Sequence, residues 1–424
     1  MRIVHAGELP ASFFEYREAA PVEGVREIMD QVRRRGDAAV VEYTARFDGV
    51  ELSGLRVPLE DIHAARDNLS LQTAHAIRMA GENIRRFAEM QMRQFGEIEV
   101  ELQPGVFTGQ KVVPLDRVGV YVPGGRFPLI STLLMTAIPA QVAGVKEIAI
   151  CSPPTHQGSV HPAILAAAEM LGLNEVYRVG GVQAIAALAC GTQSIPRVDK
   201  IVGPGNAHVA RAKREVFGEV GIDLVAGPTE VMIIADESAN PRWVAADLLA
   251  QAEHDPEAQP VLVTPSEALA EAVPAEIQAQ LATLPTAEIA REAVERNGWI
   301  IRVDSLEAAA EIANRKAPEH LQLQVAQPEA VVPLLRHYGS LFIGELSAEV
   351  LGDYSAGINH TLPTNGVARY RGGLSVQDFI KLQTTLRVTE RGIRDIGPVA
   401  GALAKAEGLE GHYRSVALRM EKNP

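Results

Sequence analysis

The sequence predicts an α/β protein with two tandem, incomplete Rossmann-like domains, an N-terminal arm and a small, mostly helical C-terminal domain. Short strand-like apolar runs alternate with helical runs from about residue 118 to residue 343, a pattern typical of mainly parallel sheets covered by helices. Connectors rich in Gly and Pro occur at strand ends, at residues 122–125, 202–205 and 226–229. Because ligands bind at the carboxyl ends of strands in open α/β sheets, we expect a site there.

Composition limits the classes of function. The chain has 424 residues, of which 47% are hydrophobic, and a net charge of −13, so we expect sizeable cores and no nucleic-acid partner. Its two cysteines, Cys151 and Cys190, provide no disulfide framework and fit a reducing cytoplasm. No stretch approaches the roughly 18 uninterrupted apolar residues of a membrane span, so we expect a cytoplasmic protein without a membrane anchor.

The N-terminal part is predicted to be helical. Residues 1–20 form the expected arm. Apolar residues at helical spacing predict an amphipathic helix over residues 21–48 and a long helix from about residue 59 to residue 95,.

Two α/β alternations follow. The first has predicted strands at 118–122, 147–151, 175–179, 200–202 and 223–225, with helices at 130–143, 161–171, 182–190 and 207–217. The second has predicted strands at 231–235, 261–264, 299–303, 321–325 and 340–343, with helices at 241–251, 266–284 and 305–315. The chain then becomes rich in loops up to about residue 373, and a mostly helical segment ends it.

One dipeptide joins an acid to a base. Glu319 and His320 follow Pro318 on the short connection between a predicted helix and a predicted strand, where a rigid scaffold can aim side chains into a cleft. Neighbouring side chains point in different directions, so the pair could serve two separate proton transfers. The alternative is an ordinary loop with a charged rim.

Signals for cofactors are weaker. The nearest match to a dinucleotide-binding motif is Gly203-Pro204-Gly205, after a strand and before a helix but without the third glycine, so a tight turn is an equal interpretation. Gln251 and His254 share one helix face, and Asp353, His360 and His412 lie further along the chain. Such side chains suit zinc, yet nothing in their spacing gathers them.

Taken together, these segments resemble histidinol dehydrogenase over nearly the whole chain. The resemblance rests on many ordered motifs, at residues 118–125, 131–135, 137–140, 179–186, 198–206, 226–231, 251–254, 317–321, 359–364, 373–376 and 407–409, followed by His412.

The resemblance implies a zinc-dependent homodimer that oxidises L-histidinol to L-histidine with two NAD, through histidinal. It implies one zinc per subunit, an acid–base pair at Glu319 and His320, and a C-terminal segment that reaches across the dimer to complete the neighbouring site. The implied zinc ligands are Gln251, His254, Asp353 and His412. The implied NAD contacts are Tyr121, Gln183 and Asn206. The implied substrate contacts are Thr229, Gln251, His254, His320, Asp353, His360, Glu407 and His412.

The resemblance also suggests a division of the chain. Residues 21–117 and 230–370 are expected to form the first α/β domain, with the zinc and catalytic residues. Residues 118–229 are expected to form the second, on the NAD side, and residues 371–424 the dimer-crossing segment.

Two alternatives stay open. The family usually has Ser at the position of Thr229, whose β-branching restricts its rotamers, and some relatives oxidise other small polar alcohols, such as a sulfonated diol. A two-lobed ligand-binding protein without catalysis is the non-enzymatic alternative.

Overall fold

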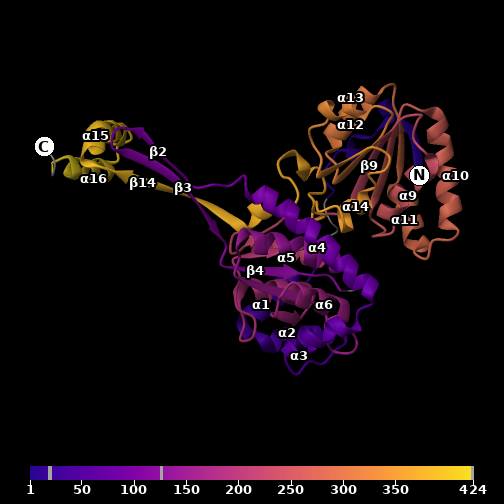
Figure 1. Ribbon diagram of the computed structural model, residues 1–424, viewed down its shortest axis with the longest axis horizontal. Helices are drawn as coiled ribbons and strands as arrows, with labels where there is room; N and C mark the ends of the chain where they lie inside the picture. Colours follow the sequence, from indigo (N-terminus) through magenta and orange to yellow (C-terminus); the bar gives the residue numbers. More distant parts are fainter. Residues whose placement is uncertain (18–21, 125–127, 422–424) are drawn as a thin grey trace.

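The computed structural model describes residues 1–17, 22–124 and 128–421, which form two α/β lobes and a long extension (Figure 1). Gly125 of the predicted connector and residues 18–20 of the predicted arm lie outside these ranges. The chain passes from one lobe to the other after residue 17, and returns before residue 230. In the described ranges, no helix is both long and apolar enough to cross a bilayer.

The five-stranded lobe contains a parallel sheet with the strand order β6-β5-β4-β7-β8. Its elements are β4 (Arg117–Tyr121), α5 (Ile130–Ala143), β5 (Glu147–Ser152), α6 (Pro162–Met170), β6 (Val176–Arg178), α7 (Gly181–Cys190), β7 (Lys200–Val202), α8 (Ala207–Val216) and β8 (Gly221–Ile222). The strand predicted at residues 223–225 is wrong. Strand β8 ends before Asp223, because this carboxylate turns inward to bind the amide of Gly203 and the buried Lys213.

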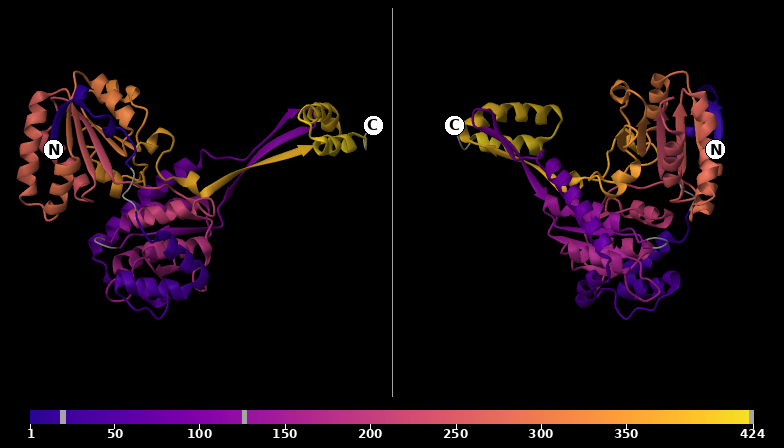
Figure 2. Two further views of the ribbon diagram at one scale, coloured as in Figure 1. Left: turned by 180° about the vertical axis from the view of Figure 1, so that it is seen from behind. Right: turned by 45° about the vertical axis from the view of Figure 1, so that its right-hand side comes forward.

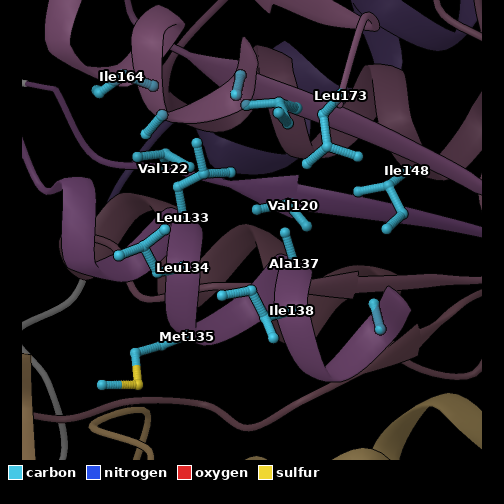
Figure 3. Close-up of a cluster of buried hydrophobic side chains, with 14 of the residues drawn as sticks. Val120, Val122, Leu133, Leu134, Met135, Ala137, Ile138, Ile148, Ile164 and Leu173 are labelled. Carbon is cyan, nitrogen blue, oxygen red and sulfur yellow. The ribbon is translucent and has the colours of Figure 1, made fainter. Parts of the chain in front are cut away.

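The core of this lobe is an apolar layer between the sheet and its helices (Figure 3). Val120 and Val122 lie at the carboxyl end of β4, and Leu133 and Ile138 of α5 pack against them. Both faces of the sheet are covered, which explains why its strands are continuous apolar runs.

Four N-terminal helices belong to this lobe, which corrects the predicted domain division. They are α1 (Val25–Arg35), α2 (Asp37–Asp48), α3 (Leu59–Ala65) and α4 (Leu71–Met92). Gly36, with a φ of 58°, divides the helix predicted at 21–48,. The apolar stripes of α1 and α2 share a core with Tyr121 and Cys151, and that of α4 shares one with Val118. Residues 21–117 therefore do not join residues 230–370 in one domain.

The six-stranded lobe is a parallel sheet with the order β1-β11-β10-β9-β12-β13. Residues 2–5 of the expected arm form its edge strand, since Arg2 pairs with Trp299. The elements of the lobe are β1 (Arg2–His5), β9 (Glu230–Ala235), α9 (Pro241–Ala252), β10 (Gln259–Thr264), α10 (Glu267–Leu281), α11 (Ala287–Asn297), β11 (Trp299–Arg302), α12 (Leu306–Lys316), β12 (His320–Gln324), α13 (Pro328–Val331), β13 (Ser340–Ile343) and α14 (Glu349–Tyr354).

The extension projects away from both lobes in every view (Figures 1 and 2). It is an antiparallel sheet of β2 (Ile98–Gln103), β3 (Val106–Pro114) and β14 (Ile380–Val388), with α15 (Glu390–Ala406) and α16 (Glu410–Glu421) at its tip. The prediction of a mostly helical C-terminal domain at 371–424 is therefore correct for its helices but incomplete. This domain also contains a nine-residue strand, paired with a segment from the N-terminal half.

Candidate active site

The predicted acid–base pair lies where the chain leaves α12 and enters β12. Ala317 ends the helix in the left-handed conformation, with a φ of 53°, which a residue other than glycine adopts only at a cost. Pro318 then directs the chain into the strand. The pair thus lies at the amino end of β12, beside the start of β9. The structure thus confirms the predicted position of the pair on a connection from a helix to a strand.

Glu319 is buried and is held by the connection that precedes β9. Its Oε2 accepts hydrogen bonds from the hydroxyl of Thr229 at 2.6 Å and from the amide of Glu230 at 2.9 Å. Burial raises the pKa of this carboxyl to about 7, which is close to the value that a general base needs at neutral pH. The Thr229 hydroxyl also accepts a bond from the amide of Gln251, so it connects the acid to α9.

His320 lies between two carboxylates. Its Nδ1 is 3.2 Å from the carbonyl oxygen of Glu230 and 3.7 Å from Oε2 of Glu319, while Nε2 is 3.5 Å from Oδ1 of Asp353. Glu319 and His320 therefore face each other, which corrects the expectation that they point apart. Burial lowers the pKa of His320, but the carboxylates of Glu319, Asp353 and Glu349 outweigh it and raise that pKa to about 10.

Further predicted residues gather around Asp353. Helix α14, which carries this residue, packs against α9, which carries Gln251. Burial acts to raise the pKa of Asp353, but the hydrogen bond and the charge of His320 outweigh it and hold that pKa below its usual value. The charges of His254 and His360 act on Asp353 in the same direction. The structure thus brings Thr229, Gln251, His254, Asp353 and His360 to the catalytic pair.

Glu407 and His412 are not brought to this site within one chain. They lie exposed near the junction of α15 and α16, at the tip of the extension. Among the described ranges, no group of three or more His, Cys, Asp or Glu side chains is placed to hold a metal ion. One chain presents only Gln251, His254 and Asp353 of the four expected ligands.

A cavity of about 1410 Å³ leads from this site across the ends of strands in the five-stranded lobe. His254 and Tyr354 line it on the side of the six-stranded lobe, whereas Glu319 and His320 are not among its lining residues. The predicted cofactor residues Tyr121, Gln183 and Asn206 all line it. Tyr121 ends β4, Gln183 lies in the first turn of α7 and Asn206 caps α8, so the three residues lie at the carboxyl edge of this sheet.

Some residues that support the site were missed by sequence reasoning. Lys316 and Glu230 form a buried ion pair at 2.9 Å, directly behind the connection that carries Glu319. Lys213 and Asp223 form a second buried pair, and both bind the backbone of Gly203 in the cofactor-side loop. Lysine and glutamate are common on protein surfaces, so these residue types do not by themselves indicate a buried ion pair. Only their positions next to the motif residues could have indicated one.

A buried acid–base pair beside a cavity lined by both α/β lobes is typical of an enzyme,. The family model described as histidinol dehydrogenase matches residues 15–420. The chain belongs to the histidinol dehydrogenase family.

Individual relatives agree with this assignment. The chain is 50% identical over 398 residues to a histidinol dehydrogenase of Geobacillus kaustophilus, covering 94% of this chain and 93% of the relative. It is 48% identical over 403 residues to that of Aquifex aeolicus, covering 95% and 92%. The crystal structure of histidinol dehydrogenase from Elizabethkingia anophelis matches with a TM-score of 0.94 and 38% identity, covering 100% and 98%.

Proposed function

We propose that this enzyme oxidises L-histidinol to L-histidine, through histidinal, with two NAD, in the last steps of histidine biosynthesis. The observation that carries the proposal is the buried pair of Glu319 and His320, with Asp353 at the far side of the imidazole. The relatives that share half of its sequence are named for histidinol, which favours this alcohol over a sulfonated diol.

His320 is proposed as the base in both oxidations. The carbonyl of Glu230 can only accept a hydrogen bond, so Nδ1 carries the proton,. Nε2 is then the atom proposed to act as the base, and it lies 3.5 Å from Oδ1 of Asp353. A hydride leaves the alcohol carbon only as its hydroxyl proton is removed, and Nε2 takes that proton.

Glu319 is proposed to activate the water that hydrates the aldehyde between the two oxidations. Both of its described bonds use Oε2, so Oε1 can receive a proton from water. The Thr229 hydroxyl orients this carboxylate, and a Ser hydroxyl would do the same. This explains why Thr is compatible with the reaction at a position where the family usually has Ser.

Zinc fits the donors that one chain presents, because amide oxygen, imidazole nitrogen and carboxylate oxygen are all zinc ligands. Gln251, His254 and Asp353 would hold it. When bound, zinc would position the amine and imidazole of the substrate and, by neutralising Asp353, lower the pKa of His320 toward neutrality.

NAD fits the cavity in the five-stranded lobe. The buried Oε1 of Gln183 has no hydrogen-bond partner in the ranges described, so it can accept a bond from a nucleotide. A Cβ on Gly205 would lie 2.4 Å from Cγ1 of Val209, so this loop before α8 needs glycine, and glycine also lets a ligand approach the backbone closely. NAD, when bound, accepts the hydride.

A homodimer with shared sites is proposed because one chain does not complete the ligand set. The extension that carries Glu407 and His412 exposes apolar side chains along its strands, with Leu102 66% exposed and Leu386 67% exposed. Burying such a surface against a second copy is favourable. It would bring the tip of the extension to the partner's site.

The yield of NADH per histidinol tests the proposed reaction. We expect two NADH for each L-histidinol consumed, and L-histidine as the product by chromatography. One NADH per substrate, or turnover of a sulfonated diol in preference to histidinol, would contradict the proposal.

Replacing Glu319 by glutamine is expected to impair the two oxidations unequally. Histidinal oxidation should lose more, because it depends on hydration of the aldehyde. In the unmodified enzyme this step should slow as the pH falls through about 7, because burial raises the pKa of Glu319 to about 7 and only the ionised carboxylate takes a proton. The measurement is stopped-flow NADH absorbance with each substrate. Equal losses in both steps would exclude Glu319 from water activation.

Replacing His254 by alanine is expected to lower the zinc bound per subunit, because one of the three ligands within the chain is lost. Elemental analysis after dialysis measures the metal content. His156→Ala, which removes an exposed histidine elsewhere, is the matched control and should keep its zinc. Unchanged metal in H254A would exclude this ligand.

A further inference from the structure

The position of Asp48 lowers the stability of the folded protein. It is the last residue of α2, where the aligned peptide dipoles leave partial negative charge, so a carboxylate is unfavourable there. Its Oδ2 is buried and has no hydrogen-bond partner in the ranges the structure describes. Burial raises the pKa of this carboxyl to about 6. A residue that costs stability in these ways calls for a ligand that satisfies it.

The position of Asp48 in the cavity indicates which ligand. On the side of the six-stranded lobe, His254 and Tyr354 line the cavity and lie near Asp353 of the candidate site. The wall formed by α1 and α2, with Asp48, belongs to the other lobe. Asp48 is close to Tyr121, whose pKa rises to about 12 through burial and, secondarily, through the charge of Asp48. A dinucleotide whose nicotinamide reacts on the side of the candidate site would place its adenosine along the wall formed by α1 and α2.

The chemistry of the wall favours a particular group. A carboxylate only accepts hydrogen bonds, and a ribose diol offers two hydroxyl donors to its two oxygens. Acidic side chains bind the ribose in this way in other dinucleotide sites. Among the described residues, the same wall carries Glu23, Glu27 and one cation, Arg46. This excess of negative charge opposes a phosphate on the 2′ oxygen.

We propose that Asp48 binds the adenosine ribose diol of the nucleotide and selects NAD over NADP. This inference rests on the proposed use of NAD. It assigns to α2 a part of the cofactor site that lies outside the strand-end loops.

The test is Asp48→Asn, studied as the full-length enzyme. Fluorescence titration with NADH should give a Kd raised about 10-fold, because a charge-assisted hydrogen bond is lost. Calorimetric titration with ADP-ribose, which lacks nicotinamide, should show the same loss, while the ratio of NADPH to NADH affinity should rise. Turnover at saturating NAD should stay within about twofold, because Asp48 is outside the catalytic pair.

Two comparisons separate this role from others. Glu27→Gln removes an exposed charge from the same wall and should change the NADH Kd by less than about twofold. The melting temperature of D48N should equal or exceed that of the unmodified enzyme, and a clear fall would mean that Asp48 is structural. If the unmodified enzyme binds NADH and D48N binds it equally well, the subsite is wrong. If neither binds NADH, the NAD-dependent function fails as well.

Discussion

Replacing His320 by alanine is expected to lower the rate of NADH formation from histidinol at least about 10²-fold, the lower range for loss of a general base. Both proposed oxidations need a proton removed from an oxygen, and Nε2 of His320, which faces Asp353, is the proposed base. The loss should appear in kcat with either histidinol or histidinal as substrate. Steady-state NADH absorbance measures both.

The control for this prediction is an exposed histidine of the other lobe. His63 lies on α3, away from the cavity lining, and His63→Ala should keep full turnover. NADH binding should also persist in H320A, since the cavity that the nucleotide would occupy is lined by other residues. Near-normal turnover of H320A would remove His320 from the proposed role.

Replacing Lys316 by methionine is expected to destabilise the enzyme by about 3–5 kcal/mol, the usual cost of leaving one member of a buried ion pair alone. Lys316 and Glu230 are both 4% exposed and lie 2.9 Å apart. Without the ammonium group, Glu230 keeps a buried charge beside the chain that holds Glu319. The melting temperature should fall by roughly 6–20 °C, as measured by calorimetry.

An exposed ion pair of the same lobe provides the matched control. Arg302 on β11 pairs with Glu267 at 2.8 Å, and the two side chains are 43% and 65% exposed. Arg302→Met should shift the melting temperature little, because exposed pairs contribute at most about 1 kcal/mol. If K316M and R302M melt alike, the buried pair does not stabilise the lobe.

Much of the parallel architecture could be predicted because local patterns encode it. The helix at Ile130–Ala143 and the strand at Ser340–Ile343 match the predicted bounds, since apolar periodicity and flanking turns mark them. The same patterns do not encode partners. The apolar stripes of α1 and α2 show that these helices are buried, but not against which sheet.

The extension was missed for a related reason. Ile98, Val100 and Leu102 alternate with polar residues, and this alternation indicates a strand. Neither segment indicates by itself which strand it pairs with. Strand β14 begins at Ile380 and pairs with β3, which is distant in the sequence. The alternating side chains are also exposed in one chain, so burial within the subunit does not explain them.

The sequence indicated which residues belong to the candidate site, but it did not indicate how their side chains are arranged in space. The dipeptide of Glu319 and His320 was visible because an acid and a base are adjacent in the sequence. The interaction of Nε2 with Asp353 depends on how α14 packs, which is tertiary information. Placement at the amino edge of one sheet, opposite the carboxyl edge of the other, depends on how two lobes meet.

The edge strand β1 has a consequence for synthesis. Its register pairs Arg2 with Trp299, so β1 is synthesised 297 residues before its partner strand. At roughly 5–20 residues per second, this delay is about 15–60 s. The β-sheet of the five-stranded lobe is fully synthesised by Ile222 and can form during that interval. The sheet that carries Glu319 and His320 cannot be completed until translation has passed β13, so the surroundings of this pair form later than the sheet of the five-stranded lobe.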